Sequence, residues 1–239
     1  MLPDSTTRLN AWLPRKSHGK AIHVRQFSLV VSLLVILISC FPYHVLSQNK
    51  PMNAASVETL RGQVKELAHQ TQTITSDFIQ EKNMAMITEK IISRGKFYFK
   101  KEKMLRWEYV DPFSYLIIIR NDQISVKDEH KVTHFNVKSN KVFLEINRII
   151  LGSLQGTLLY DKVNFTPAFL ENPSSYIVTL KPLTQKLKES ISEIVIHFDR
   201  KDFTVNRVEM FEPGGDRTRI NFTNKKLNQP ISDEKFVAR

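Results

Sequence analysis

The stretch KFYFKKEKMLRWEYVDP, residues Lys96–Pro112, carries the clearest structural signal in this chain of 239 residues. Apolar and charged residues alternate in it, which is typical of β-strands that have one dry face. The residues expected on the dry faces of two successive strands are Phe97, Phe99, Leu105, Trp107 and Tyr109. Such a face either forms ordinary core or lines a cavity that receives an apolar ligand, and the alternation leaves both interpretations open.

Alternating segments continue on both sides of this stretch, and turn sequences such as VDPFS and RNDQ separate several of them. Upstream, TITSDFIQEK carries Phe78 on one face, and downstream Ile196 and Phe198 share a face of SISEIVIHFDR. Short strands joined by short turns predict an antiparallel meander. A sheet of about ten strands has to curl or close.

Two other segments are expected to be helical. Residues 57–74 repeat apolar side chains at helical spacing, and either Asn53 or Ser56 can cap that helix. The alternation stops between Lys141 and Asn172, where a mostly apolar stretch with two glycines predicts one or two short, loosely held helices. We therefore expect a mainly β (α+β) fold. It is a curled, incompletely closed antiparallel β-barrel of about 10–11 strands, covered by an N-terminal helix and a mid-chain helical lid.

The N-terminus has the features of a secretory signal. Basic residues precede the apolar run FSLVVSLLVILISCF, residues 27–41, which is short for a bilayer span of about 20 residues. Small residues then precede a cut between Ser47 and Gln48. We expect residues 1–47 to be a cleaved secretory signal peptide of an exported protein and residues 48–239 to be a single domain.

Cys40 leaves a second interpretation of the N-terminal segment open. The sequence LISC, Leu37–Cys40, also fits the lipobox that precedes a lipid-modified cysteine. An acylated Cys40 would anchor the protein to a membrane. Because Cys40 is the only cysteine, the chain can form no internal disulfide, and residues 48–239 offer no thiol for catalysis or metal binding.

Catalysis and metal binding find little support in the motifs. The chain contains no G-x-S-x-G elbow, phosphate-binding loop or H-E-x-x-H pair. His130 and His134 lie in β-type sequence, where residues i and i+4 are about 13 Å apart. The formal net charge of +11 comes from scattered lysines and arginines, so nucleic acid is not an expected partner. We expect no enzyme activity, no catalytic residue, no metal and no cofactor.

Four stretches, in order along the chain, resemble the LolA-type periplasmic outer-membrane lipoprotein carrier protein family. ITSDFIQ, with Phe78 and Gln80, is similar to the family's Phe-x-Gln strand. The family's Gly, Lys-Arg-Pro, Arg-Trp and Pro signature is carried here by Gly95, Lys100, Arg106, Trp107 and Pro112. ILGSLQGTL stands where the family has its lid helix, and GGDRTRINFTNKKLNQPISDEKF resembles the closing pattern. The resemblance spans roughly residues 55–236.

The resemblance implies a periplasmic chaperone, of the Gram-negative type of cell envelope, with an unclosed barrel that is lined by aromatic residues. Such a carrier accepts lipoprotein acyl chains from an inner-membrane ABC lipoprotein-releasing complex, delivers them to an outer-membrane acceptor, and works as a monomer. We expect the acyl-chain cavity to be lined by Phe78, Phe97, Phe99, Leu105, Trp107, Tyr109, Ile118, Ile196 and Phe198. The expected lid contacts are Lys101, which stands at the family's arginine, with Arg106, Ile150 and Leu154.

Two alternatives to a soluble carrier remain at this stage. One is a membrane-anchored lipid-binding lipoprotein or acceptor on the same scaffold, acylated at Cys40. The other is an exported hydrolase that acts on a lipid or a glycan, for which the chain offers no motif.

Overall fold

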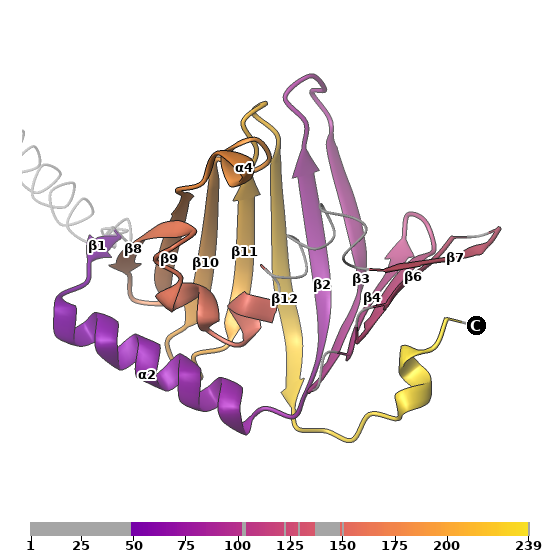
Figure 1. The fold of residues 1–239 in the computed structure, drawn as a ribbon, viewed down its shortest axis with the longest axis horizontal. Coiled ribbons are helices and arrows are strands. Elements are labelled where there is room, and N and C mark those ends of the chain that lie inside the picture. Colours follow the sequence, from indigo (N-terminus) through magenta and orange to yellow (C-terminus); the bar gives the residue numbers. More distant parts are fainter. Residues whose placement is uncertain are drawn as a thin grey trace, which may run out of the picture. The chain divides into compact units, whose positions relative to one another are not determined.

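A single antiparallel sheet dominates the part of the chain that the computed structural model describes. The described residues are 49–101, 104–121, 123–128, 130–136, 149 and 151–238. Their twelve strands follow the order β1-β8-β9-β10-β11-β12-β2-β3-β4-β5-β6-β7, so β1 and β7 are the two edges and the sheet does not close into a barrel. Figure 1 shows the strands side by side, with α2 and the mid-chain helical turns on one face. The expected fold, mainly β and incompletely closed, is confirmed.

The boundaries of the elements follow most of the expected segments. The strands are β1 (Lys50–Pro51), β2 (Thr73–Asn83), β3 (Lys90–Lys100), β4 (Met104–Asp111), β5 (Tyr115–Arg120), β6 (Gln123–Lys127), β7 (Val132–Asn136), β8 (Phe165–Glu171), β9 (Ser175–Pro182), β10 (Glu193–Asp199), β11 (Val205–Phe211) and β12 (Arg217–Leu227). The helices are α2 (Ala54–Gln70), η2 (Thr157–Tyr160), α4 (Gln185–Lys188) and η3 (Asp233–Phe236). Residues 149 and 151–154 are also helical. None of the described helices is long and apolar enough to cross a membrane.

Strand β8 lies in a region where the sequence predicted only helices. Pro167 is in the middle of this strand and is paired with Leu180 of β9. On its other side β8 pairs with β1 at Leu170 and Glu171, and the Phe169 carbonyl accepts a hydrogen bond from the Met52 N–H at 3.0 Å. At Pro167 the strand is therefore a sheet edge, where the missing N–H of proline removes no ladder hydrogen bond. The unexpected β1 and β8 account for a strand count above 10–11.

Helix α2 begins at the first of the two expected caps. The Asn53 side chain accepts a hydrogen bond from the Ser56 backbone N–H at 2.8 Å. Thr71 caps the C-terminal end of the helix, since its N–H and hydroxyl both donate to the Leu67 carbonyl. The apolar stripe on α2 is buried, since Leu60 and Val64 are only 1% and 2% exposed. Burial of that stripe fixes α2 against the sheet.

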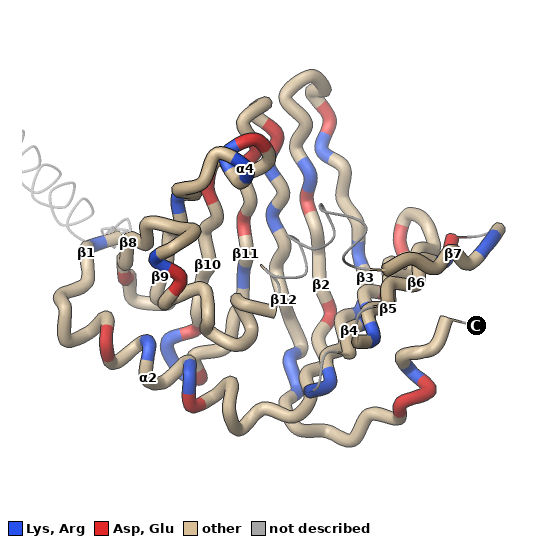
Figure 2. The backbone as a smooth tube through the Cα atoms, viewed as in Figure 1, with Lys and Arg blue, Asp and Glu red and all other residues tan. Residues whose placement is uncertain are grey.

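The face of the sheet that carries α2, here called the inner face, holds two apolar clusters. The helix-side cluster joins α2 and η2 to strands β8–β11, and its buried members include Leu60, Val64, Leu158, Leu159, Val178, Ile194, Ile196 and Phe198. The aromatic cluster lies over β2–β6, and its buried members are Phe78, Phe97, Phe99, Leu105, Trp107, Ile119 and Ile124. Residues 149 and 151–160, here called the covering segment, contact both clusters. No residue of this segment is charged, and Figure 2 shows it in tan.

The opposite, outer face of the sheet is covered near the C-terminus by η3. Phe236 is 2% exposed and packs against Leu116 and Ile118 of β5. The Lys100 ammonium donates to the Ile231 carbonyl at 3.0 Å and pairs with Asp233 at 2.5 Å. The C-terminal segment is thus attached to the outer side of β3–β5.

Gly95 provides a test of how closely the aromatic cluster is packed on β3. A Cβ atom at this position would lie 2.1 Å from the Glu108 carbonyl oxygen and 2.7 Å from the Phe78 ring. Gly95→Ala should therefore lower the free energy of unfolding by about 3 kcal/mol, since overpacking forces strand β4 or the ring to move.

The matched control is Gly62→Ala, because a Cβ on this exposed glycine of α2 would meet no atom within 4 Å. It should raise the free energy of unfolding by about 0.5–1 kcal/mol. Urea unfolding followed by circular dichroism measures both. Equal urea midpoints for Gly95→Ala and Gly62→Ala would contradict the close packing around Gly95.

Candidate functional site

The aromatic cluster is built by cross-strand pairs on the inner face. Phe97 lies directly opposite Trp107, and Phe99 lies opposite Leu105. The Trp107 ring has its centroid 4.9 Å from that of Phe97 and 4.8 Å from that of Phe78, both edge to face. Edge-to-face contacts of this kind are favourable beyond the area that they bury. The expected alternation of Lys96–Pro112 thus produces a continuous aromatic surface.

The polar tips of this surface remain uncharged. The Tyr109 hydroxyl donates to Gln80 Oε1 at 3.1 Å, and burial, with a smaller effect of Tyr115, raises the pKa of Tyr109 to about 12. The Trp107 indole nitrogen is buried and has no hydrogen-bond partner among the described residues. The aromatic surface is therefore better suited to an apolar ligand than to a polar one.

A cavity of about 40 Å³ lies where the two clusters meet. Val64 and Leu67 of α2 form one side of it, Leu154 of the covering segment another, and Phe97 and Phe222 the sheet side. This volume holds roughly three water molecules. An acyl chain can therefore enter only if α2 or the covering segment moves away from the sheet.

The structure brings most of the expected cavity residues to the inner face. Phe78, Phe97, Phe99, Leu105 and Trp107 are buried in the aromatic cluster, Tyr109 packs against it, and Ile196 and Phe198 are in the helix-side cluster. Phe97 and Phe198 line the cavity itself. Their part in ligand binding stays a prediction.

Ile118 was wrongly assigned to the cavity wall. It is paired with Arg106, on the outer face, and packs with Leu116 and Phe236. Ile117 and Ile119, opposite Trp107 and Leu105, contribute to the aromatic cluster instead. The sequence could not reveal this, because three consecutive isoleucines contain no alternation from which to determine the face.

The expected lid contacts divide between the two faces. Leu154 packs on the aromatic cluster and lines the cavity. The Lys101 ammonium donates to the His69 carbonyl at 2.9 Å, so it contacts the last turn of α2. Arg106 lies on the outer face, where it donates to the Lys235 carbonyl at 3.0 Å and not to any described residue of the covering segment. Ile150 and Cys40 lie outside the described residues.

Several cavity residues were not expected from the sequence. Val64 and Leu67 were assigned only to a packing stripe, although they line the cavity from α2. Phe222 shares the inner face with Ile220, and this alternation could have revealed it. Lys225 could not have been found, since a bulge in β12 determines its direction.

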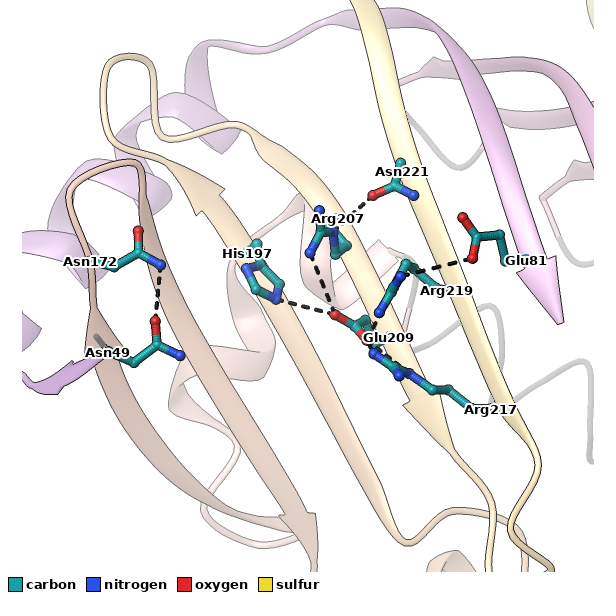
Figure 3. A network of polar contacts seen from close by, with 9 residues as sticks. All are labelled: Asn49, Glu81, Asn172, His197, Arg207, Glu209, Arg217, Arg219 and Asn221. Atoms are coloured by element: carbon teal, nitrogen blue, oxygen red, sulfur yellow. Dashed lines mark hydrogen bonds and ion pairs between the residues drawn. The ribbon is translucent and has the colours of Figure 1, made fainter. Parts of the chain in front are cut away.

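The outer face carries a polar network over β10–β12, which Figure 3 shows. Glu209, 5% exposed, accepts a hydrogen bond from Arg217 Nε at 3.0 Å and lies 3.4 Å from Arg219 Nε and 3.5 Å from His197 Nε2. Burial by itself would raise the pKa of Glu209, but the hydrogen bond from Arg217 and the charges of both arginines outweigh it and hold the pKa below its usual range. Burial and the nearby Arg207 lower the pKa of His197. The network joins β10, β11 and β12, and Arg219 extends it to Glu81 of β2 at 3.8 Å.

Glu209→Gln tests whether this network stabilises the sheet. The free energy of unfolding should fall by about 2 kcal/mol, because the arginines lose the carboxylate to which they donate. Glu212→Gln is the control three residues further along the chain, since the Glu212 pair with Lys82 is partly exposed at 3.7 Å and should contribute less than about 0.5 kcal/mol. Urea unfolding measures both variants, and equal losses would contradict a central role of Glu209.

No group of three His, Cys, Asp or Glu side chains within the described ranges could hold a metal ion. The features that remain are an open sheet, an aromatic inner face and an apolar cover. They define a half-open barrel with an apolar interior.

The chain belongs to the LolA family, described as outer membrane lipoprotein carrier protein LolA, which matches residues 69–239. The resemblance found in the four sequence stretches is thereby confirmed. None of the curated proteins matches the chain.

Solved structures with similar folds have low sequence identity to this chain. A LolA superfamily protein from Nitrosomonas europaea is 9% identical over 76% of this chain and 97% of its own, with a TM-score of 0.40. MucB is 10% identical over 78% of this chain and 64% of its own, with a TM-score of 0.49. The Mycobacterium tuberculosis lipoprotein LppX is 10% identical over 75% of this chain and 99% of its own, with a TM-score of 0.42.

Proposed function

We propose that this protein is a periplasmic carrier that binds the acyl chains of lipoproteins on the inner face of its sheet and moves them from the inner to the outer membrane. The observation that carries the proposal is the aromatic cluster beneath an uncharged covering segment, with a cavity at their junction. Membership of the LolA family supports the same cargo. The protein acts by reversible binding and performs no chemistry on the cargo.

The contacts of the covering segment favour opening on the side of the aromatic cluster. Arg61 of α2 donates to the Leu159 carbonyl at 3.1 Å and lies 5.3 Å from the Tyr160 ring, so polar contacts hold η2 on α2. Toward the aromatic cluster the described residues of the segment provide only apolar contacts, through Leu151 and Leu154. Opening there breaks no hydrogen bond between described residues.

An acyl chain can replace these apolar contacts directly. Each methylene group that the aromatic surface buries contributes about 0.8 kcal/mol, so a few methylene groups offset the loss of one leucine contact. The cover therefore competes with the cargo for the same surface. Loading and release then depend on which of the two occupies it.

Export and partners complete the proposal. Residues 1–47 are a cleaved secretory signal peptide, and residues 48–239 form the single carrier domain. An inner-membrane ABC lipoprotein-releasing complex supplies the cargo, an outer-membrane acceptor receives it, and the carrier is a monomer that binds no nucleic acid. The intact mass of the exported form separates this from anchoring at Cys40, because a start at Gln48 excludes acylation of that cysteine.

Two measurements test the carrier function directly. Native mass spectrometry of the protein purified from the periplasm should detect bound lipid or lipoprotein. A transfer assay then follows a triacylated lipoprotein from loaded donor vesicles to acceptor vesicles with and without the protein. Absence of bound lipid together with unchanged transfer would exclude a carrier.

Leu154→Gln tests the competition between cover and cargo. A polar side chain weakens the closed state, so the variant should bind a synthetic triacylated lipopeptide about tenfold more tightly than the wild type. The emission of Trp107, which lies in the aromatic cluster, reports binding. Val163→Gln is the control, because Val163 follows the covering segment and is 79% exposed. Unchanged or weaker binding by Leu154→Gln would contradict a competing cover.

A further inference from the structure

One charged side chain reaches the cavity, and an irregularity in β12 directs it there. Strand β12 pairs with β2 in regular register up to Thr223, which lies opposite Asp77, and pairing resumes with Lys226 opposite Thr75. One extra residue of β12 therefore stands between these two pairs. Asn224 takes a left-handed conformation at φ 52°, and its side-chain amide donates to Asp77 Oδ2 at 2.8 Å.

The extra residue changes which side chains face inward. In a regular strand Phe222, Asn224 and Lys226 would share one face. With the bulge, Lys225 and Leu227 instead line the cavity together with Phe222. Bulges are known to redirect single side chains near binding sites. The bulge in β12 thus places an ammonium group in a mostly apolar cavity.

The surroundings of Lys225 leave this ammonium only partly satisfied. Its nitrogen donates to Thr204 Oγ1 and lies 3.5 Å from the Val205 carbonyl oxygen, so two acceptors serve a group with three donors. It forms no ion pair within the described part of the chain. The two acidic groups whose charges act on Lys225 are Asp202 and Asp199, and these already accept hydrogen bonds from Thr204 and Lys201.

Three other polar side chains of the cavity donate to backbone carbonyls, and the Thr204 hydroxyl donates to Asp202 Oδ1. Thr71 donates to the Leu67 carbonyl, Ser76 to the Thr223 carbonyl and Ser153 to the Ile149 carbonyl. Burial lowers the pKa of Lys225, and Asp202 and Asp199 oppose this effect only in part. An anion beside Lys225 would offset its desolvation.

We propose that the cavity binds amphiphiles with an anionic headgroup, a carboxylate or a phosphate ester at the end of an acyl or alkyl chain, and that Lys225 pairs with that headgroup. This inference rests on the proposed function, since the chain of the ligand lies on the same aromatic face. Lys225 adds a preference for ligands with a negative charge to the preference of the aromatic face for apolar chains. The carrier then accepts acidic lipids as well as the ester-linked anchor of a lipoprotein.

Lys225 also holds the β10–β11 turn through Thr204, so the test has to separate anchoring of a headgroup from support of the turn. Three ligands with the same twelve-carbon chain achieve this at pH 7.5: dodecanoate and dodecyl phosphate below their micelle concentrations, and dodecanol below its solubility limit. Binding is measured by titration calorimetry and by the emission of Trp107. Loss of turn support would weaken all three ligands alike, whereas loss of the anchor affects only the two anions.

The variants are Lys225→Met, which keeps the apolar stem, and Lys225→Arg, which keeps the charge. Lys226→Met is the matched control, because Lys226 is exposed, adjacent in sequence and not part of the cavity lining. The wild type should bind at least one of the two anions about tenfold or more tightly than dodecanol. Lys225→Met should abolish this preference without changing the affinity for dodecanol, while Lys225→Arg and Lys226→Met should retain it.

The outcomes distinguish this inference from the proposed function. Equal affinity of the wild type for all three ligands, or an anion preference that Lys225→Met retains, overturns the role of Lys225 and leaves acyl-chain binding intact. Failure to bind any of the three overturns both. If Lys225→Met fails to fold, the test uses the wild type and Lys225→Arg alone. A wild type that does not prefer the anions to dodecanol again overturns the inference. The stronger of the two anions identifies a carboxylate or a phosphate as the natural headgroup.

Discussion

The packing of the cover on the inner face of the sheet is the interaction on which the rest of this structure depends. The sheet ends at β1 and β7 and does not close, so hydrogen bonding alone cannot seal its interior from water. The apolar surface of β2–β6 and β8–β11 is instead shielded by α2 and the covering segment. A closed barrel of this size would bury its aromatic residues permanently. An open sheet with a separate cover can expose them to a ligand.

The two parts of the cover are held differently, and this difference gives the proposed opening its direction. Helix α2 is fixed by a buried stripe and by polar contacts at its ends, among them Lys101 at its last turn. The covering segment is attached to α2 by the hydrogen bond from Arg61. Its described residues contact the aromatic cluster only through leucine side chains. Apolar contacts are non-directional and can be exchanged for a lipid chain with little loss of free energy.

None of the described residues that line the cavity is charged, with one exception. Glu209 forms ion pairs with Arg217 and Arg219 on the outer face, and η3 with Lys100 covers the outer side of β3–β5. Lys225 is the exception, since a bulge directs it inward. A single cation within an apolar cavity can select among ligands that share the same chain, because it discriminates by headgroup and not by area.

The sequence by itself determined the class of fold and the main wall of the site. Alternation in Lys96–Pro112 placed Phe97, Phe99, Leu105 and Trp107 on one face, because side chains of a strand point to opposite sides in turn. Helical spacing likewise predicted α2, and the four family-like stretches predicted the family. Three consecutive isoleucines show no alternation, so Ile118 was assigned to the wrong face. Strand β8, which contains Pro167, was not predicted as a strand.

Only the tertiary structure decided which residues meet across the sheet. Arg106 on the outer face donates to the carbonyl of Lys235 in η3, which is 129 residues further along the chain. The cavity combines residues from α2, the covering segment and the strands β2, β3 and β10–β12, which no local pattern relates to one another. The inward direction of Lys225 depends on a register shift between β12 and β2, and register is a property of the pairing of two strands, not of either strand alone.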